Sequence, residues 1–165
     1  MKTLYLNRHA KSSWENMSIS DFSRPLNKRG KRDAPFMGKL LCTKVEKPHI
    51  LITSPAVRAK ATAYVLSECF ELGKDEIIEN EQIYEATVSD LINIIKSVPK
   101  EKNIVMLVGH NPAFTMLSNH LTDNYIDNIP TCGFVQINFD TNNWKDIDKE
   151  KGKLVFFEYP KKYKK

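Results

Sequence analysis

Residues 103–112, NIVMLVGHNP, join a continuous apolar run to a short polar segment that begins at His110. An apolar run of this length without alternation is typical of a strand that is buried on both faces of a parallel sheet. The runs TLYLN at residues 3–7 and HILITS at residues 49–54 have the length of strands as well. Helical patterns separate these strands, and the alternation predicts a three-layer α/β/α sandwich with a mostly parallel central sheet.

The first helix is indicated by apolar spacing and by a capping residue. Asn27 is expected to cap a helix that runs to about Thr43. The residues expected on its buried face are Phe36, Met37, Leu40 and Leu41. Residues 12–26, which precede it, lack helical periodicity and are expected to form a long loop. Loops of that length usually carry function.

The remaining elements follow from the same signals. Three further helices are expected, at residues 56–72, 89–98 and 112–121. Pro55 suits the first turn of one of them, and Asn111 is the expected cap of the last. Two late runs, GFVQINF and KLVFFEY, predict additional strands, and the turn-rich segment NNWKDID lies between them.

Length and composition favour one globular domain. The chain has 165 residues, of which 41% are hydrophobic and 27% charged, and this ordinary balance excludes a disordered or collagen-like chain. We therefore expect a single domain over residues 1–160 and a basic C-terminal tail over residues 161–165. No apolar run reaches the ~18 residues of a membrane span, and the N-terminus turns polar after Leu6, so we expect a cytoplasmic protein without a secretory signal.

Charge and cysteine content bear on the partners. The formal net charge is +5, but the tail KKYKK holds four lysines, which leaves +1 for the rest of the chain. The tail is expected to be a solubilising end, with contact to a partner or a membrane surface as the alternative, and nucleic acid is not an expected partner. Cys42, Cys69 and Cys132 are widely spaced and form no CxxC pair, so neither a disulfide framework nor a zinc site is suggested.

Basic side chains follow three of the predicted strands. Arg8 and His9 end the first, Ser54 and Pro55 end the second with Arg58 one helical turn later, and His110 ends the third. Ligands of open α/β sheets bind beyond the carboxyl ends of the strands. Two arginines and two histidines are therefore expected at one edge of the sheet.

This set of side chains suits a phosphoryl group. Guanidinium groups donate paired hydrogen bonds to phosphate oxygens and stay charged near neutral pH. Helix N-termini at this edge would add backbone N–H groups. An imidazole can itself attack phosphorus, because its ordinary pKa of about 6.5 leaves it largely neutral at pH 7.

The same residues lie in three short segments, LYLNRHAKS at 4–12, TSPAVRAKATA at 53–63 and VGHNP at 108–112. In this order they resemble the three signatures of the histidine phosphatase superfamily, also called phosphoglycerate mutase-like. The variant RHAKS, the segment DFSRPLNKRG and the short chain resemble its SixA-like phosphohistidine phosphatase branch. The likeness spans about residues 2–140.

The resemblance implies a two-step mechanism. His9 would attack phosphorus in line and become phosphorylated, and water would then hydrolyse the intermediate. Arg8, Arg58 and His110 would hold the phosphoryl oxygens while negative charge shifts. No metal and no cofactor is required by this scheme.

The acid for the leaving group is a separate question. Glu85, in IYEAT, is the candidate by position, with a solvated carboxylate as the alternative. An expelled alkoxide has a parent acid with a pKa near ~15.7, whereas expelled imidazole has one near ~6.5. Phosphohistidine therefore breaks without a strong proton donor, which agrees with the SixA-like members that the chain resembles.

Three further residues are candidates for binding phosphate or substrate. Lys11 and Ser12 lie beside the expected nucleophile, two and three residues after it, although a solvated loop explains them as well. Arg24 is expected either to contact the substrate or to anchor the loop over residues 12–26. His49 and His120 lack a motif and are interpreted as structural.

Three functions compete. The first is a phosphatase for phosphohistidine on a signalling or carrier protein, which the RHAKS form and the lack of a large inserted cap favour. The second is a phosphatase for small phosphomonoesters, and the third is a noncatalytic phosphate-binding module. The expected partner is accordingly a phosphohistidine-carrying protein or a small phosphorylated compound.

Overall fold

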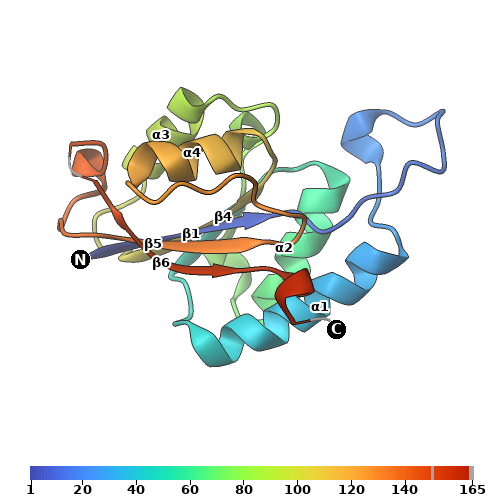
Figure 1. Ribbon diagram of the computed structural model, residues 1–165, viewed down its shortest axis with the longest axis horizontal. Coiled ribbons are helices and arrows are strands. Elements are labelled where there is room, and N and C mark those ends of the chain that lie inside the picture. The colour runs from blue at the N-terminus through green and yellow to red at the C-terminus, as the bar shows by residue number, and fades with distance from the viewer. Residues whose placement is uncertain (150, 164–165) are drawn as a thin grey trace.

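Six strands form the central sheet of the computed structural model, which describes residues 1–149 and 151–163 (Figure 1). Their order across the sheet is β3-β2-β4-β1-β5-β6. The first four pair in parallel, and β5 and β6 add two antiparallel strands beside β1. The strands are β1 (Lys2–Arg8), β2 (Ile50–Thr53), β3 (Ile77–Glu79), β4 (Ile104–Gly109), β5 (Phe134–Phe139) and β6 (Lys153–Glu158).

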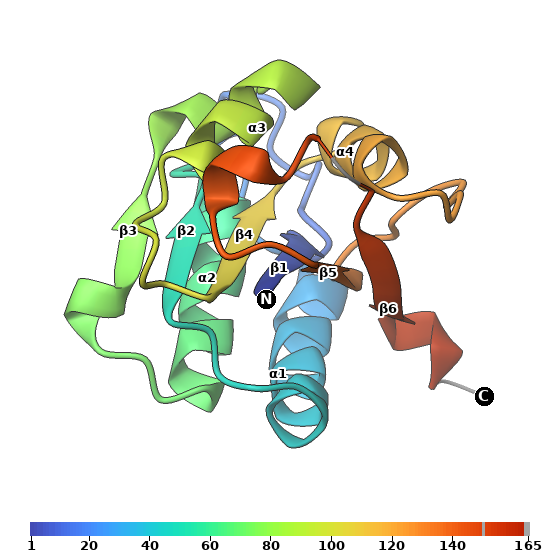
Figure 2. The ribbon, with the colours of Figure 1, turned by 90° about the vertical axis from the view of Figure 1, so that its left-hand side faces the viewer.

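Two helices cover each face of the sheet. The helices are α1 (Lys28–Lys44), α2 (Val57–Cys69), α3 (Val88–Lys96) and α4 (Ala113–Leu121). Figure 1 shows α3 and α4 on one side and α1 and α2 on the other, and Figure 2 shows the same layers from the end. The buried apolar residues form two clusters, one for each face. These layers confirm the predicted α/β/α sandwich with its mostly parallel sheet.

The strand β4 shows why the inner strands are so apolar. All six of its residues are buried, because strands lie on both edges of β4 and helices on both faces. Along β4, Val105 and Leu107 pack under α3 and α4, whereas Met106 and Val108 pack over α1 and α2. The unbroken apolar run of the sequence is thus divided between two cores.

The helix α1 begins as predicted but presents a different face to the core. The Oδ1 atom of Asn27 accepts the backbone N–H of Gly30 at 2.9 Å, which confirms the predicted cap. Phe36 is 39% exposed, so the predicted face is wrong at this position, whereas Leu40 is partly buried and packs against the core cluster. The residues that the helix buries are Gly30, Asp33, Ala34, Met37, Gly38 and Leu41.

Two other helices begin later than predicted. Helix α2 starts at Val57 with Ala56 at its N-cap, so Pro55 lies before the helix rather than in its first turn. Helix α4 starts at Ala113, and Pro112 takes the N-cap position. The prediction of Asn111 as the N-cap is therefore wrong by one residue, although its side chain accepts the backbone N–H of Thr115 at 3.2 Å.

The end of the chain folds back on the domain as far as Tyr163. Residues Pro160–Lys162 form a short 3-10 helix, and Lys162 Nζ donates to Glu158 Oε1 at 3.0 Å. The hydroxyl of Tyr163 donates to the other oxygen of the Glu158 carboxylate. Lys162 and Tyr163 of the predicted basic tail therefore contact the body of the protein, and Lys164 and Lys165 lie outside the described residues.

Two findings concern the described residues as a whole. Among the described residues, Cys42, Cys69 and Cys132 form no disulfide bond. Within residues 1–149 and 151–163, no helix is long and apolar enough to cross a membrane.

Candidate active site

The carboxyl ends of three neighbouring parallel strands meet at one edge of the sheet. β1 ends at Arg8 and leads into His9, and β4 ends at Gly109 and leads into His110. The two strands pair in register up to Arg8 and Gly109, and His9 N–H continues the pairing with Gly109 C=O at 3.0 Å. The two imidazole rings consequently lie 5.2 Å apart between centroids. The predicted convergence of these side chains is confirmed.

One ring nitrogen of His9 is engaged by the backbone. Its Nδ1 lies 2.7 Å from the carbonyl oxygen of Ala10, and a carbonyl oxygen can only accept, so the proton resides on Nδ1. Nε2 therefore carries the free lone pair. Burial, with the charges of nearby groups such as Arg58, outweighs this hydrogen bond and lowers the pKa of His9 to about 3. The ring is neutral and nucleophilic across the neutral pH range.

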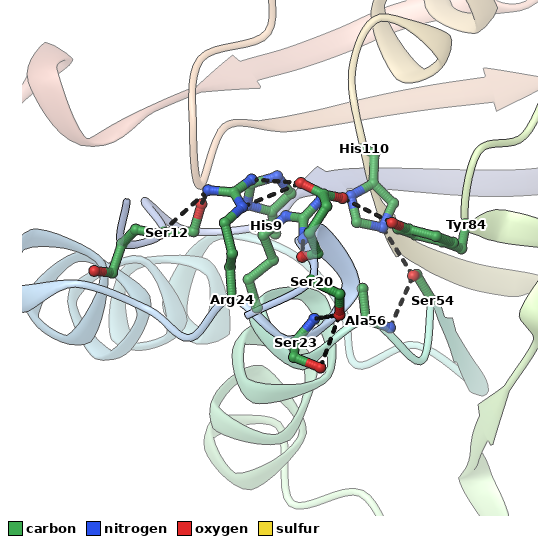
Figure 3. Close-up of polar contacts among 12 residues, drawn as sticks. His9, Ser12, Ser20, Ser23, Arg24, Ser54, Ala56, Tyr84 and His110 are labelled. Carbon is green, nitrogen blue, oxygen red and sulfur yellow. Dashed lines mark hydrogen bonds and ion pairs between the residues drawn. The ribbon is translucent and has the colours of Figure 1, made fainter. Parts of the chain in front are cut away.

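His110 is held by Ser54, the residue that directly follows β2. Its Nε2 lies 2.8 Å from Oγ of Ser54, which also accepts the backbone N–H of Ala56 at 3.2 Å (Figure 3). A serine hydroxyl has one proton and two acceptor positions, so Ser54 Oγ can hold His110 Nε2 either as donor or as acceptor. Nδ1 is buried and has no partner among the described residues. Burial and the charge of Arg58 lower the pKa of His110 to about 4.

Both arginines keep one buried donor free. Arg8 Nη1 donates to the carbonyl of Ile129 at 2.9 Å, and both Nη atoms of Arg58 bind Asp21. The Nε atoms of Arg8 and Arg58 are buried and have no partner within the described part of the chain. Burial and the charge of Arg58 lower the pKa of Arg8. Buried polar groups are normally paired, so unpaired N–H donors beside a free imidazole nitrogen indicate a site for an anion.

The loop over residues 12–26 lies beside this site. Arg24 is buried, and its Nη1 donates to Oγ of buried Ser12 at 2.7 Å. Its guanidinium carbon lies 3.5 Å from the centre of the Trp14 ring. Ser12 and Arg24 thus hold each other, as in the loop-anchoring alternative for Arg24, and a contact of either residue with phosphate or substrate stays a prediction. Figure 3 shows the contact between Arg24 and Ser12.

Asp21 and Tyr84 lie at this site and were not anticipated from the sequence. The Asp21 carboxylate binds Arg24 and Arg58, each at 3.0 Å, and accepts from the hydroxyl of Tyr84 at 2.7 Å. Partial burial works to raise the pKa of Asp21, but the hydrogen bonds from Tyr84 and Arg58 and the nearby positive charge outweigh it and lower the pKa to about 2. The ring of Tyr84 meets that of His110 edge-on at 5.5 Å. The only sequence signal for Asp21 was its place in DFSRPLNKRG.

The side chains of Glu85 and Lys11 make no hydrogen bond with the other candidate site residues among the described residues. Glu85 is exposed and has a left-handed φ of 57°, and it follows Tyr84, whose ring contacts His110. Its carboxylate has no hydrogen bond or ion pair within the described residues, and its role as an acid stays a prediction. Lys11 is partly buried, and its carbonyl oxygen accepts the N–H of Asn27 at 3.0 Å. A phosphate contact through the Lys11 side chain also stays a prediction.

No metal cluster is evident at this edge. Among residues 1–149 and 151–163, no three His, Cys, Asp or Glu side chains lie close enough together to hold a metal ion.

Comparison with known proteins places the fold. A SixA protein histidine phosphatase solved with tungstate superposes with a TM-score of 0.82 and 19% identity, covering 98% of this chain and 99% of that one. An Agrobacterium tumefaciens protein proposed to be the phosphohistidine phosphatase SixA superposes with a TM-score of 0.81 and 25% identity, covering 96% and 98%. The architecture is that of the phosphoglycerate mutase-like α/β proteins.

Sequence comparison identifies the family. The family model for the histidine phosphatase superfamily (branch 1) matches residues 4–91, more than half of the chain. An uncharacterised protein of Mycobacterium leprae is 28% identical over 167 residues, covering 93% of this chain and 99% of the relative. A chloroplastic uncharacterised protein of Arabidopsis thaliana is 28% identical over 153 residues, covering 88% and 70%. The chain belongs to the histidine phosphatase superfamily, and this membership supports phosphatase activity.

Proposed function

We propose that this chain is a protein phosphohistidine phosphatase that works through a covalent phospho-His9 intermediate. The observation that carries the proposal is the state of the His9 ring. Its Nδ1 proton is committed to the Ala10 carbonyl, so Nε2 presents a lone pair among unpaired N–H donors. A neutral imidazole nitrogen in a cationic pocket is suited to attack a phosphoryl group.

In the first step, Nε2 of His9 forms a bond to phosphorus as the bond from phosphorus to the leaving nitrogen breaks. The electron pair of that broken bond goes to the leaving nitrogen, and the substrate ring departs as neutral imidazole because its other ring nitrogen carries a proton. Arg8, Arg58 and His110 donate to the phosphoryl oxygens through nitrogens that have no other partner among the described residues. Because these donors are already positioned, they stabilise the transition state without reorganisation.

In the second step, water attacks phosphorus and the bond to His9 Nε2 breaks. Inorganic phosphate leaves, and His9 recovers its neutral ring. The low pKa of His9 favours this return, because the ring that departs from phosphorus is stable without an added proton at neutral pH.

The choice of phosphohistidine as substrate rests on the leaving group. Imidazole departs more readily than an alkoxide, which requires a proton from a well-placed acid. Glu85 is exposed and makes no hydrogen bond within the described residues, so the site offers a phosphomonoester little help from this carboxyl group. The similarity to SixA structures, including one at 25% identity, supports the same choice.

The proposal is tested with a histidine-phosphorylated phosphotransfer protein as substrate. The native chain should release inorganic phosphate from it, and His9→Ala should lower the rate by at least about a thousandfold, as expected when a nucleophile is removed. His120→Ala is the matched control, because His120 is an exposed histidine near the opposite end of α4 from the site, and its side chain makes no hydrogen bond among the described residues. A phosphoprotein that stays intact with native enzyme, or equal rates for the two variants, would contradict the proposal.

A further inference from the structure

Asp21 places a carboxylate directly beside the proposed phosphoryl pocket. The residue begins a short 3-10 helix, Asp21–Ser23, within the loop over residues 12–26. Its Oδ1 accepts from Nε and Nη2 of Arg24 at 3.1 and 3.0 Å. Its Oδ2 accepts from Nη2 of Arg58 at 3.0 Å and from the Tyr84 hydroxyl at 2.7 Å. Two guanidinium groups and one phenol therefore surround a single carboxylate.

Arg58 connects this carboxylate to the phosphoryl pocket. Its Nη1 donates to the backbone carbonyl of Asp21 at 2.7 Å and its Nη2 to the carboxylate, whereas its Nε is buried without a partner among the described residues. The two Nη atoms of Arg58 are thus occupied by Asp21, whereas its Nε remains available to a phosphoryl oxygen. The two anion positions are adjacent but distinct, and Asp21 leaves the unpaired donors of Arg8 and His110 open.

The surroundings of Asp21 are those of a binding site for a ligand carboxylate. Arginine forks pair with carboxylates and phosphates through two parallel hydrogen bonds, and a tyrosine hydroxyl adds a third donor. The site remains accessible, because the Asp21 side chain is 49% exposed. A small substrate that carries a phosphoryl group and a second anionic group would need these same donors.

We propose that Asp21 is a specificity-determining residue that fills, from within the chain, the subsite for a second anionic group next to the phosphoryl pocket. This inference rests on the proposed function and narrows its substrate class. The site favours phosphoryl compounds whose neighbouring group carries no negative charge, such as the imidazole of phosphohistidine. It disfavours phosphorylated carboxylic acids for two reasons. The carboxylate of such a ligand is repelled by the carboxylate of Asp21, and the hydrogen-bond donors that it needs are already occupied by Asp21.

Binding of two non-hydrolysable ligands tests the inference without any turnover. Phenylphosphonate carries one anionic group, and 3-phosphonopropionate adds a carboxylate. Calorimetry should show that the native protein prefers phenylphosphonate. Asp21→Ala should tighten 3-phosphonopropionate by about tenfold relative to phenylphosphonate, the gain expected from one new charge-assisted hydrogen bond. Asp21→Asn, which removes the charge but leaves the volume, should give a smaller gain.

The control for net charge is Glu15→Ala. Glu15 is an exposed carboxylate of the same loop with no ion pair among the described residues, so its removal should change both affinities equally. An unchanged ratio of the two affinities in both Asp21 variants, or the same ratio change in Glu15→Ala, would overturn the inference. Failure of the native protein to bind phenylphosphonate would contradict the assignment of a phosphoryl-binding pocket. The proposed function fails separately, in the turnover assay with His9→Ala.

Discussion

At the scale of single residues, His9 is prepared for attack by the backbone next to it. The Ala10 carbonyl fixes the proton on Nδ1, and the backbone N–H of Ala10 is itself held by Oγ1 of Thr62 at 2.9 Å. The His9 side chain is only 7% exposed. The ring therefore has a defined tautomer, and its environment opposes protonation.

This environment predicts how the ring titrates. The pKa of His9 is lowered to about 3 and that of His110 to about 4, so both rings should stay neutral as the pH falls from 8 to 5. A histidine in a flexible peptide titrates near pH 6.5. Ring ¹⁵N shifts of histidine-labelled protein, measured from pH 8 to 5, should show Nδ1 of His9 protonated and Nε2 unprotonated throughout. A midpoint between pH 6 and 7 for His9 would show that the cavity tolerates the imidazolium ion.

The same residues show how far the site could be predicted from sequence. Arg8, His9 and His110 were found because each follows an apolar run, and the ends of parallel strands converge. Asp21 and Tyr84 were missed because 63 positions separate them and nothing local marks their contact. Such a contact depends on the path of a loop, which hydrophobic periodicity does not describe.

At the scale of elements, the start of α1 supports the segment that carries the nucleophile. Asn27 N–H donates to the carbonyl of Lys11, and a Cβ added at Gly30 would lie 2.1 Å from that carbonyl oxygen. Only a glycine allows the helix to approach the backbone so closely. The position of His9 thus depends on a helix residue with no side chain.

Gly30→Ala should disturb both stability and activity. The backbone must move to admit the new methyl group, which we expect to cost about 1–3 kcal/mol of unfolding free energy. The turnover rate should fall as well, because Lys11 lies two residues after His9. Urea unfolding and phosphatase assays measure the two effects. Gly73→Ala is the control, because a Cβ added at Gly73 would have Oε1 of Glu76, at 3.4 Å, as its nearest neighbour. Equal losses of stability and activity in the two variants would contradict this account.

Some strands and helices could be predicted from the sequence better than others. β4 was predictable because it is buried on all sides, whereas β3 was missed because it has only three residues and lies at the sheet edge. The predicted buried face of α1 was wrong at Phe36. Much of the face that packs is made of small residues, Ala34 and Gly38 among them, and a count of large apolar side chains overlooks them.

At the scale of the whole molecule, the strand order makes the site. β1 and β2 are far apart in sequence but both pair with β4, so Arg8, Ser54 and His110 arrive at one edge. The layers and the convergence of strand ends followed from the alternation of strands and helices. The antiparallel pairing of β5 and β6 did not, because local patterns do not determine strand direction.

The central claim is that Nε2 of His9 accepts the phosphoryl group. It is tested most directly by quenching the native enzyme with substrate in alkali, mapping the acid-labile phosphate by mass spectrometry and identifying the phosphorylated nitrogen by ³¹P–¹⁵N coupling. We predict one phosphoryl group on His9, bonded to Nε2, and none on His9→Ala. Phosphate on Nδ1, on another residue, or on neither protein during active turnover would contradict the account.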